Sequence, residues 1–458
     1  MTSSGPPVPP WAHTPLGAQG VPPTALATSG PPPAGASRLA AELIDQWLLD
    51  AWRDDPTRPR ICIIDDDDGA LVAHAVATGA AVTTWNDSRS ARDRVAAQCA
   101  SAYARAFAAD EAAPGAATAR PLPPGTAPAP PPGTAPAPPP GAPLPVPDPT
   151  ASLAAAMAGA NLVLGAAPKA LDRLSYFSRI AAANAAPGAQ VVWVQRVKHL
   201  HRSMNQVLER HLEDVHATRG AHKARGLVGR VPRLPTPTPA YDPASSLRVS
   251  EPELGLDLDV VALPGVFAGT RVDIGTRALL AALPAVLDQG PPPRTAVDLG
   301  CGTGILAAWI ASRCPGATVI ATDDSALAVA SAGRTALAAG IACRPHDAPN
   351  ASGQQACATA PEPGIATWWA DAAAGIRAAS VDLIVCNPPF HQGAGIDTSG
   401  AHAMFASAGR ILAPGGRLVV VANRHLRYAS ALRARVGPTT LVASSPKFVV
   451  TLSSRSAR

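Results

Sequence analysis

The chain has 458 residues, among them 51 prolines and 38 glycines, and its 38 basic and 33 acidic side chains give a formal net charge of +5. At roughly 100–200 residues per domain, this length predicts about two or three domains, and the clustered prolines exclude part of it from a packed core. The first basic residue is Arg38, the cysteines show no C-x-x-C spacing, and no long stretch is strongly apolar. We therefore expect a cytoplasmic protein without signal peptide, membrane segment, disulfide framework or zinc site.

Two segments read as unpacked, Pro-rich chain. Residues 1–36 form a Pro/Gly/Ser/Ala tail without hydrophobic periodicity, which predicts disorder. Residues 112–150 contain a perfect tandem octapeptide, PPGTAPAP, at 123–138. This repeat predicts a semi-rigid polyproline II spacer. A ligand for a partner domain, oriented by Arg120, is the alternative.

The rest of the chain alternates strands with helical stretches. After a helix at 38–52, apolar runs bounded by turn residues predict strands at 60–69, 80–88, 161–169, 190–200, 295–304, 317–325, 381–390 and 414–426. The run IATWWADA predicts a further strand. Strands separated by helices indicate βαβ units and a mostly parallel sheet. We therefore predict an α/β fold.

The two halves of the chain look like a duplication. PGAQVVWVQRVKHL at 187–200 resembles PGGRLVVVANRHL at 414–426. In the same way, the first-half segments IIDDDDGA, WNDS and GAAPK correspond to the second-half segments VDLGCGTG, ATDDS and CNPPF. The Pro-rich repeat then interrupts the first half, and periodicity breaks again near residue 240. We predict a tail at 1–36, a first domain at 37–235 containing the 112–150 insertion, a linker at 236–252 and a second domain at 253–458.

The segment VDLGCGTG carries the first signal of a ligand site. Asp298 is followed by three alternating glycines, Gly300, Gly302 and Gly304, between an apolar strand and a helix. Glycine permits positive φ and a close approach of a ligand to the backbone. The carboxyl end of a parallel strand is where open α/β sheets bind ligands. Because the turn lacks the G-x-G-x-x-G spacing of dinucleotide sites, it indicates a nucleotide-type cofactor without naming one.

Two later strands end in carboxylates. Asp323 follows the glycines by about 20 residues, where a carboxylate can bind ribose hydroxyls. Asp324 competes for this role, but we favour a helix-capping function for it, shared with Ser325. Asp371, in TWWADA, is placed to reach an adenine amino group, with Trp369 beside it for apolar contact. We therefore expect Asp323 and Asp371 to contact the cofactor.

The most specific motif is NPPF, at Asn387, Pro388, Pro389 and Phe390, which ends the apolar run VDLIVC. An exocyclic amino group on a purine is a poor nucleophile because its lone pair is delocalised into the ring. The carbonyls of Asn387 and Pro388 can accept hydrogen bonds from such a group and aim its lone pair at an electrophile. The prolines stiffen the loop and remove competing N–H donors, and Phe390 can stack on an unstacked base.

These motifs together resemble a known family. DLGCGTG, TDDS and NPPF are similar to motifs of class I S-adenosylmethionine-dependent methyltransferases that act on an amino nitrogen. PGVFAGTRVDIGTRALLAALP at 264–284, CNPPFHQG, PGGRLVVVANRHLRY and SSPKFVV resemble the ribosomal RNA guanine-N2 methyltransferases of the RlmG and RsmC type. The resemblance covers about 38–452 outside the insertion and is dense from residue 264 onward. CNPPFHQ, NRHLRY, KHL and HKARGL favour the RlmG type.

The resemblance implies two tandem Rossmann-like class I methyltransferase domains, of which the first is degenerate. The second would transfer the methyl group of S-adenosylmethionine to the N2 of a guanine in large-subunit rRNA, with small-subunit rRNA as the alternative. The implied cofactor-binding residues are Asp298, Gly300, Gly302, Gly304, Asp323, Asp371 and Asn387, and the implied catalytic residues are Asn387, Pro388, Pro389 and Phe390. Methylation of a protein glutamine amide, and a non-catalytic RNA-binding assembly factor, stay open. No metal is expected.

The first half departs from the family pattern. Four carboxylates, Asp65–Asp68, stand where the glycines should be, and GAAPK replaces CNPPF, so that Ala166 cannot supply an amide carbonyl. We expect this half to be catalytically inactive, with metal binding by the Asp run as the alternative.

Charge favours RNA as a partner. No acidic residue follows Asp397, yet basic residues occur at positions 410, 417, 424, 427, 433, 435, 447, 455 and 458. A second basic group lies in the first half, at Arg196, Lys198, Arg202, Arg219, Lys223, Arg225 and Arg230. Such groups can contact phosphates, although a solvated basic face is the alternative for any single residue.

Overall fold

The computed structural model describes residues 36–54, 59–78, 80–97, 149–233, 242–345, 363–389 and 399–456. These residues fall into two compact units. The first unit holds 36–54, 59–78, 80–86, 91–97 and 152–233, and the second holds 87–90, 149–151, 242–345, 363–389 and 399–456. Four sequence predictions lie outside the described residues, namely the tail before Ala36, the insertion before Pro149, Phe390 and Arg458.

The first unit is built on a six-stranded sheet with the order β2-β1-β3-β4-β6-β5. Its strands are β1 (Arg60–Ile64), β2 (Ala81–Trp85), β3 (Leu162–Ala166), β4 (Gln190–Arg196), β5 (Glu213–Ala217) and β6 (Ala224–Arg230). Its helices include α1 (Ala36–Asp54), α2 (Ala70–Ala77), α5 (Leu171–Asn184) and α6 (Arg202–Leu208), and α4 (Pro149–Met157) begins in the second unit. Strands β1 to β4 pair in parallel, whereas β6 pairs antiparallel with both β4 and β5.

The second unit contains an eight-stranded sheet with the order β11-β12-β10-β9-β13-β14-β16-β15. Its strands are β9 (Thr295–Leu299), β10 (Thr318–Asp323), β11 (Cys343–Pro345), β12 (Gly364–Trp369), β13 (Val381–Cys386), β14 (Leu412–Asn423), β15 (Thr439–Ser444) and β16 (Phe448–Ser454). Its helices are α7 (Ile274–Leu287), α8 (Ile305–Arg313), α9 (Ala326–Ala338), α10 (Ser399–Ile411) and α11 (Ala429–Arg435). The predicted α/β fold with a mostly parallel sheet is confirmed in both units.

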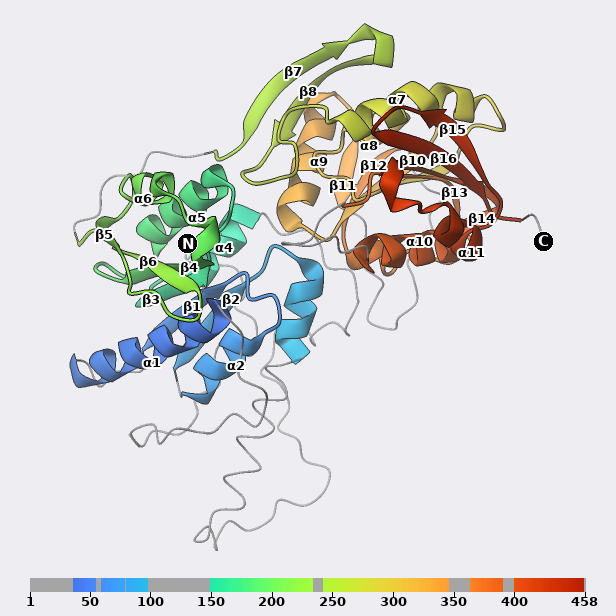
Figure 1. Ribbon diagram of the computed structural model, residues 1–458. Coiled ribbons are helices and arrows are strands. Elements are labelled where there is room, and N and C mark those ends of the chain that lie inside the picture. Colours follow the sequence, from blue (N-terminus) through green and yellow to red (C-terminus); the bar gives the residue numbers. More distant parts are fainter. Residues whose placement is uncertain are drawn as a thin grey trace, which may run out of the picture. The chain divides into compact units, whose positions relative to one another are not determined.

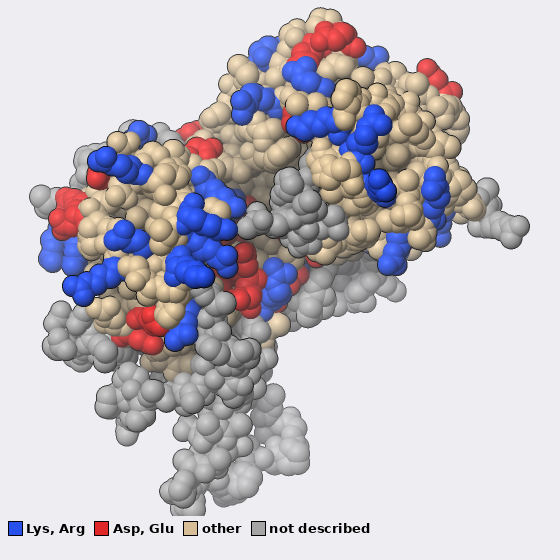
Figure 2. Space-filling model, in the orientation of Figure 1, with Lys and Arg blue, Asp and Glu red and all other residues tan. Residues whose placement is uncertain are grey.

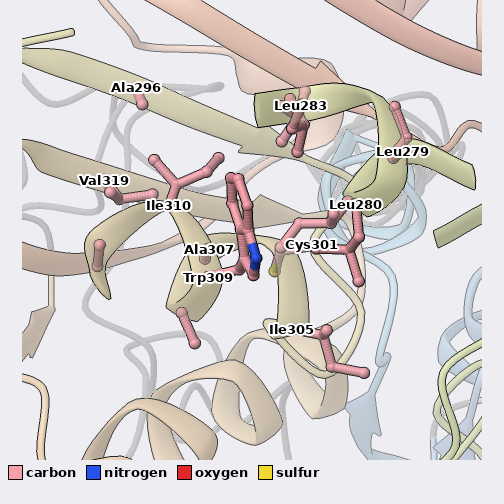
Figure 3. Close-up of a cluster of buried hydrophobic side chains, with 14 of the residues drawn as sticks. Leu279, Leu280, Leu283, Ala296, Cys301, Ile305, Ala307, Trp309, Ile310 and Val319 are labelled. Atoms are coloured by element: carbon pink, nitrogen blue, oxygen red, sulfur yellow. The ribbon is translucent and has the colours of Figure 1, made fainter. Parts of the chain in front are cut away.

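Helices cover both faces of the second sheet, and successive residues of its strands are buried against opposite faces (Figure 1). Ala296 packs with α7 and α8, whereas the next residue, Val297, packs with α10 and α11, because successive strand side chains point to opposite faces. Trp309 of α8 is 2% exposed and anchors the first of these clusters (Figure 3). Its indole nitrogen donates to the carbonyl of Leu254 at 2.9 Å. A sheet buried on both faces leaves its carboxyl edge as the place where loops can build a site.

Two features differ from the sequence predictions. The segment predicted as a linker contains β7 (Ser245–Glu251), which pairs antiparallel with β8 (Leu256–Ala262) across a short turn, and this two-stranded ribbon is labelled in Figure 1. The antiparallel strands β5, β6, β15 and β16 were not predicted from the sequence. Among the described residues, no helix combines the length and apolar character that crossing a membrane requires.

Candidate active site

The glycine turn joins β9 to α8 at the carboxyl edge of the second sheet. Gly300, Gly302 and Gly304 have φ values of 80°, 53° and 78°, a region that residues with a Cβ rarely adopt. The amides of Gly300 and Cys301 donate to the carbonyl of Thr322 at 2.9 and 3.0 Å. The turn is therefore held directly against the end of β10, the neighbouring strand.

The glycines of the turn have different reasons to lack a side chain. A Cβ on Gly304 would lie 2.8 Å from the Cα and Cβ of Ala332, so this glycine permits the close packing of α8 on α9. A Cβ on Gly302 would meet nothing within 4 Å. Gly302 thus borders open space at the predicted cofactor site, whereas the structure gives Gly304 a packing role.

Asp298 lies at the base of this turn and is 1% exposed. Its Oδ2 accepts a hydrogen bond from the amide of Ala307 at 3.0 Å, while its Oδ1 is buried without a partner among the described residues. Burial raises the pKa of Asp298 to about 7, and the nearby Asp323 adds to the rise. A buried acceptor without a partner is costly, which is typical of a site that a ligand completes.

Asp323 ends β10 and connects the turn to the next strand. Its Oδ2 accepts from the amide of Gly302 at 3.0 Å, and its Oδ1 accepts from the amide of Ser325 at 3.0 Å. Burial raises the pKa of this carboxyl to about 6, against the lowering effect of the two amides. The carboxylate therefore lies beside Gly302, at the open space that borders the turn.

Asp324 does not cap α9, so this prediction is wrong, whereas Ser325 does cap it as predicted. The N-cap of α9 is Ser325, whose Oγ accepts from the amide of Ala328 at 3.1 Å. Asp324 instead accepts from the Oγ of Ser88 at 2.6 Å and from the amide of Ser90 at 2.8 Å. At the start of α9, Asp87 accepts hydrogen bonds from the Ser325 hydroxyl and from the amide of Leu327.

Asp371 lies two residues beyond β12 and is exposed. The neighbouring residue in the predicted pocket, Trp369, pairs in register with Asp323. The Trp369 side chain is 4% exposed, and its indole nitrogen donates to the carbonyl of Asp324 at 2.8 Å. The structure thus brings the ends of β10 and β12 together, and the Trp369 side chain packs with Ala326 and Val329 of α9.

Asn387 directly follows β13 at the same edge of the sheet. Because Cys386 pairs in register with Leu299 of β9, Asn387 and Gly300 continue two neighbouring strands. Pro388 is buried and Pro389 is exposed. The Oδ1 of Asn387 is buried and has no hydrogen-bond partner among the described residues. The structure therefore places an unused amide oxygen next to the glycine turn.

The sequence prediction missed the residues that hold this amide. The Nδ2 of Asn387 donates to the Oδ2 of Asp273 at 2.8 Å and lies 3.3 Å from the Oγ1 of Thr276. Asp273 is the N-cap of α7, and its Oδ1 accepts from the amide of Thr276 at 3.0 Å. The signal available in the sequence was Asp273-Ile-Gly-Thr immediately before a helical run, which indicates a helix start but not a partner 114 residues away.

The corresponding turn of the first unit is occupied by its own side chains. Asp65 forms an ion pair with Arg173 at 2.8 Å, and the Oδ2 of Asp66 accepts from the amide of Val72 at 3.0 Å. Burial and the neighbouring Asp65 raise the pKa of Asp67. Within the described residues, no group of three or more His, Cys, Asp or Glu side chains is arranged to hold a metal ion.

Two family models and several known proteins are similar to this chain. The family model of the methyltransferase small domain matches residues 257–452, and that of the RLMG N-terminal domain matches residues 146–233. The chain is 37% identical over 265 residues to ribosomal RNA large subunit methyltransferase G of Pseudomonas paraeruginosa, and 38% identical over 266 residues to that of Pseudomonas aeruginosa strain UCBPP-PA14. Each alignment covers 58% of this chain and 63% of the relative.

A solved structure agrees in fold. The Thermus thermophilus 16S rRNA N2 G1207 methyltransferase RsmC, in complex with AdoMet and guanosine, superposes with a TM-score of 0.61 and 20% identity, covering 91% of this chain and 92% of that one. At this identity the likeness concerns the fold alone. Both family models match in order along the sequence, and the chain is similar to ribosomal RNA large subunit methyltransferase G proteins over 63% of their length.

Proposed function

We propose that the second unit transfers a methyl group from S-adenosylmethionine to the N2 of a guanine in ribosomal RNA. When bound, S-adenosylmethionine supplies an electrophilic methyl group on a sulfonium. The described residues fit this cofactor because Gly302 borders open space and Asp298 offers an unpartnered buried oxygen. Asp323 would accept from the ribose hydroxyls, and Asp371 would reach the adenine amino group.

Asn387 would hold the nucleophile. Its unpartnered Oδ1 accepts a hydrogen bond from the guanine amino group, and the carbonyl of Pro388 accepts a second. These bonds draw the amino nitrogen toward tetrahedral geometry, so that its lone pair points at the methyl group. As the N–C bond forms, the methyl–sulfur bond would break with its electron pair left on sulfur, and the amine, now positively charged, would lose a proton to water. Such positioning can be worth roughly 7–11 kcal/mol of the barrier, and the orphaned Oδ1 is the observation that carries the proposal.

Basic side chains support RNA as the substrate. In the first unit, a hollow of about 710 Å³ is lined by Arg196, Val197, Lys198, His222 and Lys223. Figure 2 shows Lys and Arg side chains grouped on the visible face of each unit. Phosphate contacts from such groups make binding dependent on salt concentration.

The C-terminal basic group divides into structural and exposed members. Guanidinium groups donate to main-chain carbonyls of this unit from Arg410, Arg417, Arg424 and Arg455. Burial also lowers the pKa of Arg410 and Arg417. Exposed side chains remain at Arg427, Arg433, Arg435 and Lys447. Among the described members of this group, we infer that these four contact RNA.

Large-subunit rRNA is the substrate that the names of the relatives favour, and small-subunit rRNA is the alternative that the name of the T. thermophilus protein suggests. An rRNA substrate also implies a cytoplasmic location. Methylation of a protein glutamine amide would use the same site, since that amide presents a similar planar NH2 group, but the basic surfaces favour RNA.

The variant N387A tests this function. We expect methyl transfer to rRNA to fall at least ~100-fold, because the aligning acceptor is lost, while the affinity for S-adenosylmethionine stays within about threefold by calorimetric titration. N205A, on α6 of the first unit, is the matched Asn→Ala control and should be fully active. Equal activity of N387A and wild type would refute the assignment. Label from the methyl group in RNase-resistant material would point to a protein substrate instead.

A further inference from the structure

Asp273 uses its two carboxylate oxygens for two different tasks. The Oδ1 accepts from the amide of Thr276 and so caps the first turn of α7. The Oδ2 accepts from the Nδ2 of Asn387 at 2.8 Å and from the hydroxyl of Thr276 at 3.3 Å. An N-cap requires only one acceptor oxygen. The second oxygen is therefore available to act on Asn387.

This contact determines which end of the Asn387 amide faces the site. A carboxylate can only accept hydrogen bonds, so the group that lies 2.8 Å from Asp273 must be the NH2 of Asn387 and not its carbonyl. The amide oxygen then points the other way, and it is the buried Oδ1 that has no partner among the described residues. Without such a partner, a primary amide can turn over and present its two donors in place of its acceptor.

Gly275 leaves the room that this arrangement needs. A Cβ at Gly275 would lie 3.0 Å from the Oδ1 and 3.2 Å from the Nδ2 of Asn387. Contacts this short require the neighbour to move, and here the neighbour is the amide itself. At the start of α7, Asp273 therefore accepts the hydrogen bond from the Asn387 amide. Gly275 leaves space for that amide, and Thr276 is its second hydrogen-bond partner.

We propose that Asp273 is a positioning residue that locks the Asn387 amide with its oxygen toward the guanine amino group. This inference rests on the proposed function, because it specifies how the acceptor of that reaction is held. If the amide turned over, its NH2 would face the NH2 of the substrate, two donors would oppose each other, and the lone pair of the nucleophile would not be aligned.

Two substitutions separate positioning from helix capping. D273S keeps a good N-cap for α7 but has a side chain too short to supply a second acceptor. D273N keeps the size of the side chain but has a single oxygen. If that oxygen caps Thr276, the new NH2 faces the NH2 of Asn387, and this repulsion favours the flipped orientation of the Asn387 amide. We expect kcat to fall at least tenfold in D273S and about 100-fold in D273N. The Kd for S-adenosylmethionine should stay within threefold in both variants.

A double substitution should rescue the reaction. In N387D alone, two carboxylates face each other, and activity should be lost. In D273N/N387D, the amide now at position 273 donates to the carboxylate now at 387, whose other oxygen still accepts from the substrate. We expect kcat at least tenfold above that of either single variant. A residue that acted only through the stability of α7 would give no such rescue. D288N, an exposed Asp→Asn change at the C-terminal end of α7, is the matched control and should match wild type.

The outcomes distinguish this inference from the function on which it depends. Wild-type activity together with full activity of D273S and D273N would overturn the positioning role and leave the proposed function intact. The same holds if the single variants lose activity and the double variant shows no recovery. The side-chain amide of Asn387 can also be followed by ¹⁵N NMR without any substrate, and its resonances should shift strongly in D273N. A wild-type protein that methylates no RNA would refute the proposed function even if these shifts appear.

Discussion

The turns at residues 65–69 and 300–304 are the most instructive pair of regions in this molecule. Each spans five residues between a central strand and the following helix, from β1 to α2 and from β9 to α8. Both begin with a positive φ, 51° at Asp65 and 80° at Gly300, and both end with a left-handed glycine, 76° at Gly69 and 78° at Gly304. Both ends of the turn therefore have a similar backbone conformation in the two halves, although glycine occupies the first position in only one, and the third residue has a positive φ only in the second turn.

The turns differ in what fills the space beside them. In the second turn, the third residue is Gly302, with φ 53° and nothing within 4 Å of a hypothetical Cβ. In the first turn, the third residue is Asp67, and the guanidinium of Arg94 donates to its carbonyl at 2.7 Å. The comparison teaches that similar ends of a turn do not conserve a ligand site, because the residues between them decide whether space and acceptors remain.

We expect the largest effect on cofactor affinity from exchanging the third residues of the two turns, Gly302 and Asp67. G302D would place a side chain at positive φ, fill the open space, and set a second carboxylate beside Asp323, whose Oδ2 accepts from the amide of Gly302. We expect the affinity for S-adenosylmethionine to fall at least ~100-fold, since steric exclusion, backbone strain and like-charge repulsion add. Calorimetric titration measures it.

The reciprocal change is the control. D67G, in the first unit, should leave cofactor affinity and the number of bound cofactor molecules per chain unchanged. A second binding event in D67G, or unaltered affinity in G302D, would show that the difference between the turns does not lie at this residue.

The ends of β2 and β10 provide a second, smaller test. The first half has Asn86 in WNDS where the second half has Asp323 in TDDS. D323N therefore gives the second half the amide of the first. We expect cofactor affinity to fall about tenfold at pH 8, because the charge-assisted hydrogen bonds to ribose become neutral ones.

The pH dependence of the same variant sharpens this test. Burial raises the pKa of Asp323 to about 6, so in the wild type the carboxylate is progressively protonated below that pH and accepts hydrogen bonds less well. Affinity should therefore fall as pH drops from 7 to 5, and D323N should lose most of this dependence. An unchanged pH profile in D323N would remove Asp323 from the cofactor site.

The buried carboxylates of the two turns should affect stability alike. Burial raises the pKa of Asp298 to about 7 and also raises that of Asp66. Since these folded-state values exceed the unfolded value of about 3.9, the folded protein binds more protons than the unfolded chain between them. The free energy of unfolding therefore falls as pH rises from about 4 to about 7.

Neutral amides at these positions remove that penalty. D298N and D66N should each raise the free energy of unfolding at pH 8 by about 1–2 kcal/mol, as measured by urea denaturation, and by less at pH 5. Only D298N should alter cofactor affinity. Destabilisation by both variants at pH 8 would show that the ionised carboxylates hold the turns together.

The sequence predicted the parts of the site that are local in the chain. The alternation of strands and helices indicated the parallel sheets, and a glycine turn and Asn387 at strand ends could be assigned to one edge of a sheet. The contacts that complete the site join distant residues. Asp273 meets Asn387 across 114 positions, and Asp324 meets Ser88 across 236. Periodicity and spacing carry no signal for such pairs, since Asp273 and Asp324 each read alone as an ordinary helix-capping residue.

The central claim is that Asn387 aligns the N2 of a guanine in rRNA for methylation. The most direct test incubates the full chain and N387A with isotope-labelled S-adenosylmethionine and unmethylated ribosomal subunits, and then identifies the labelled nucleosides by mass spectrometry. We expect N2-methylguanosine at one position of large-subunit rRNA with the wild type, and none above background with N387A. Label on another base, or equal label with both proteins, would contradict the account.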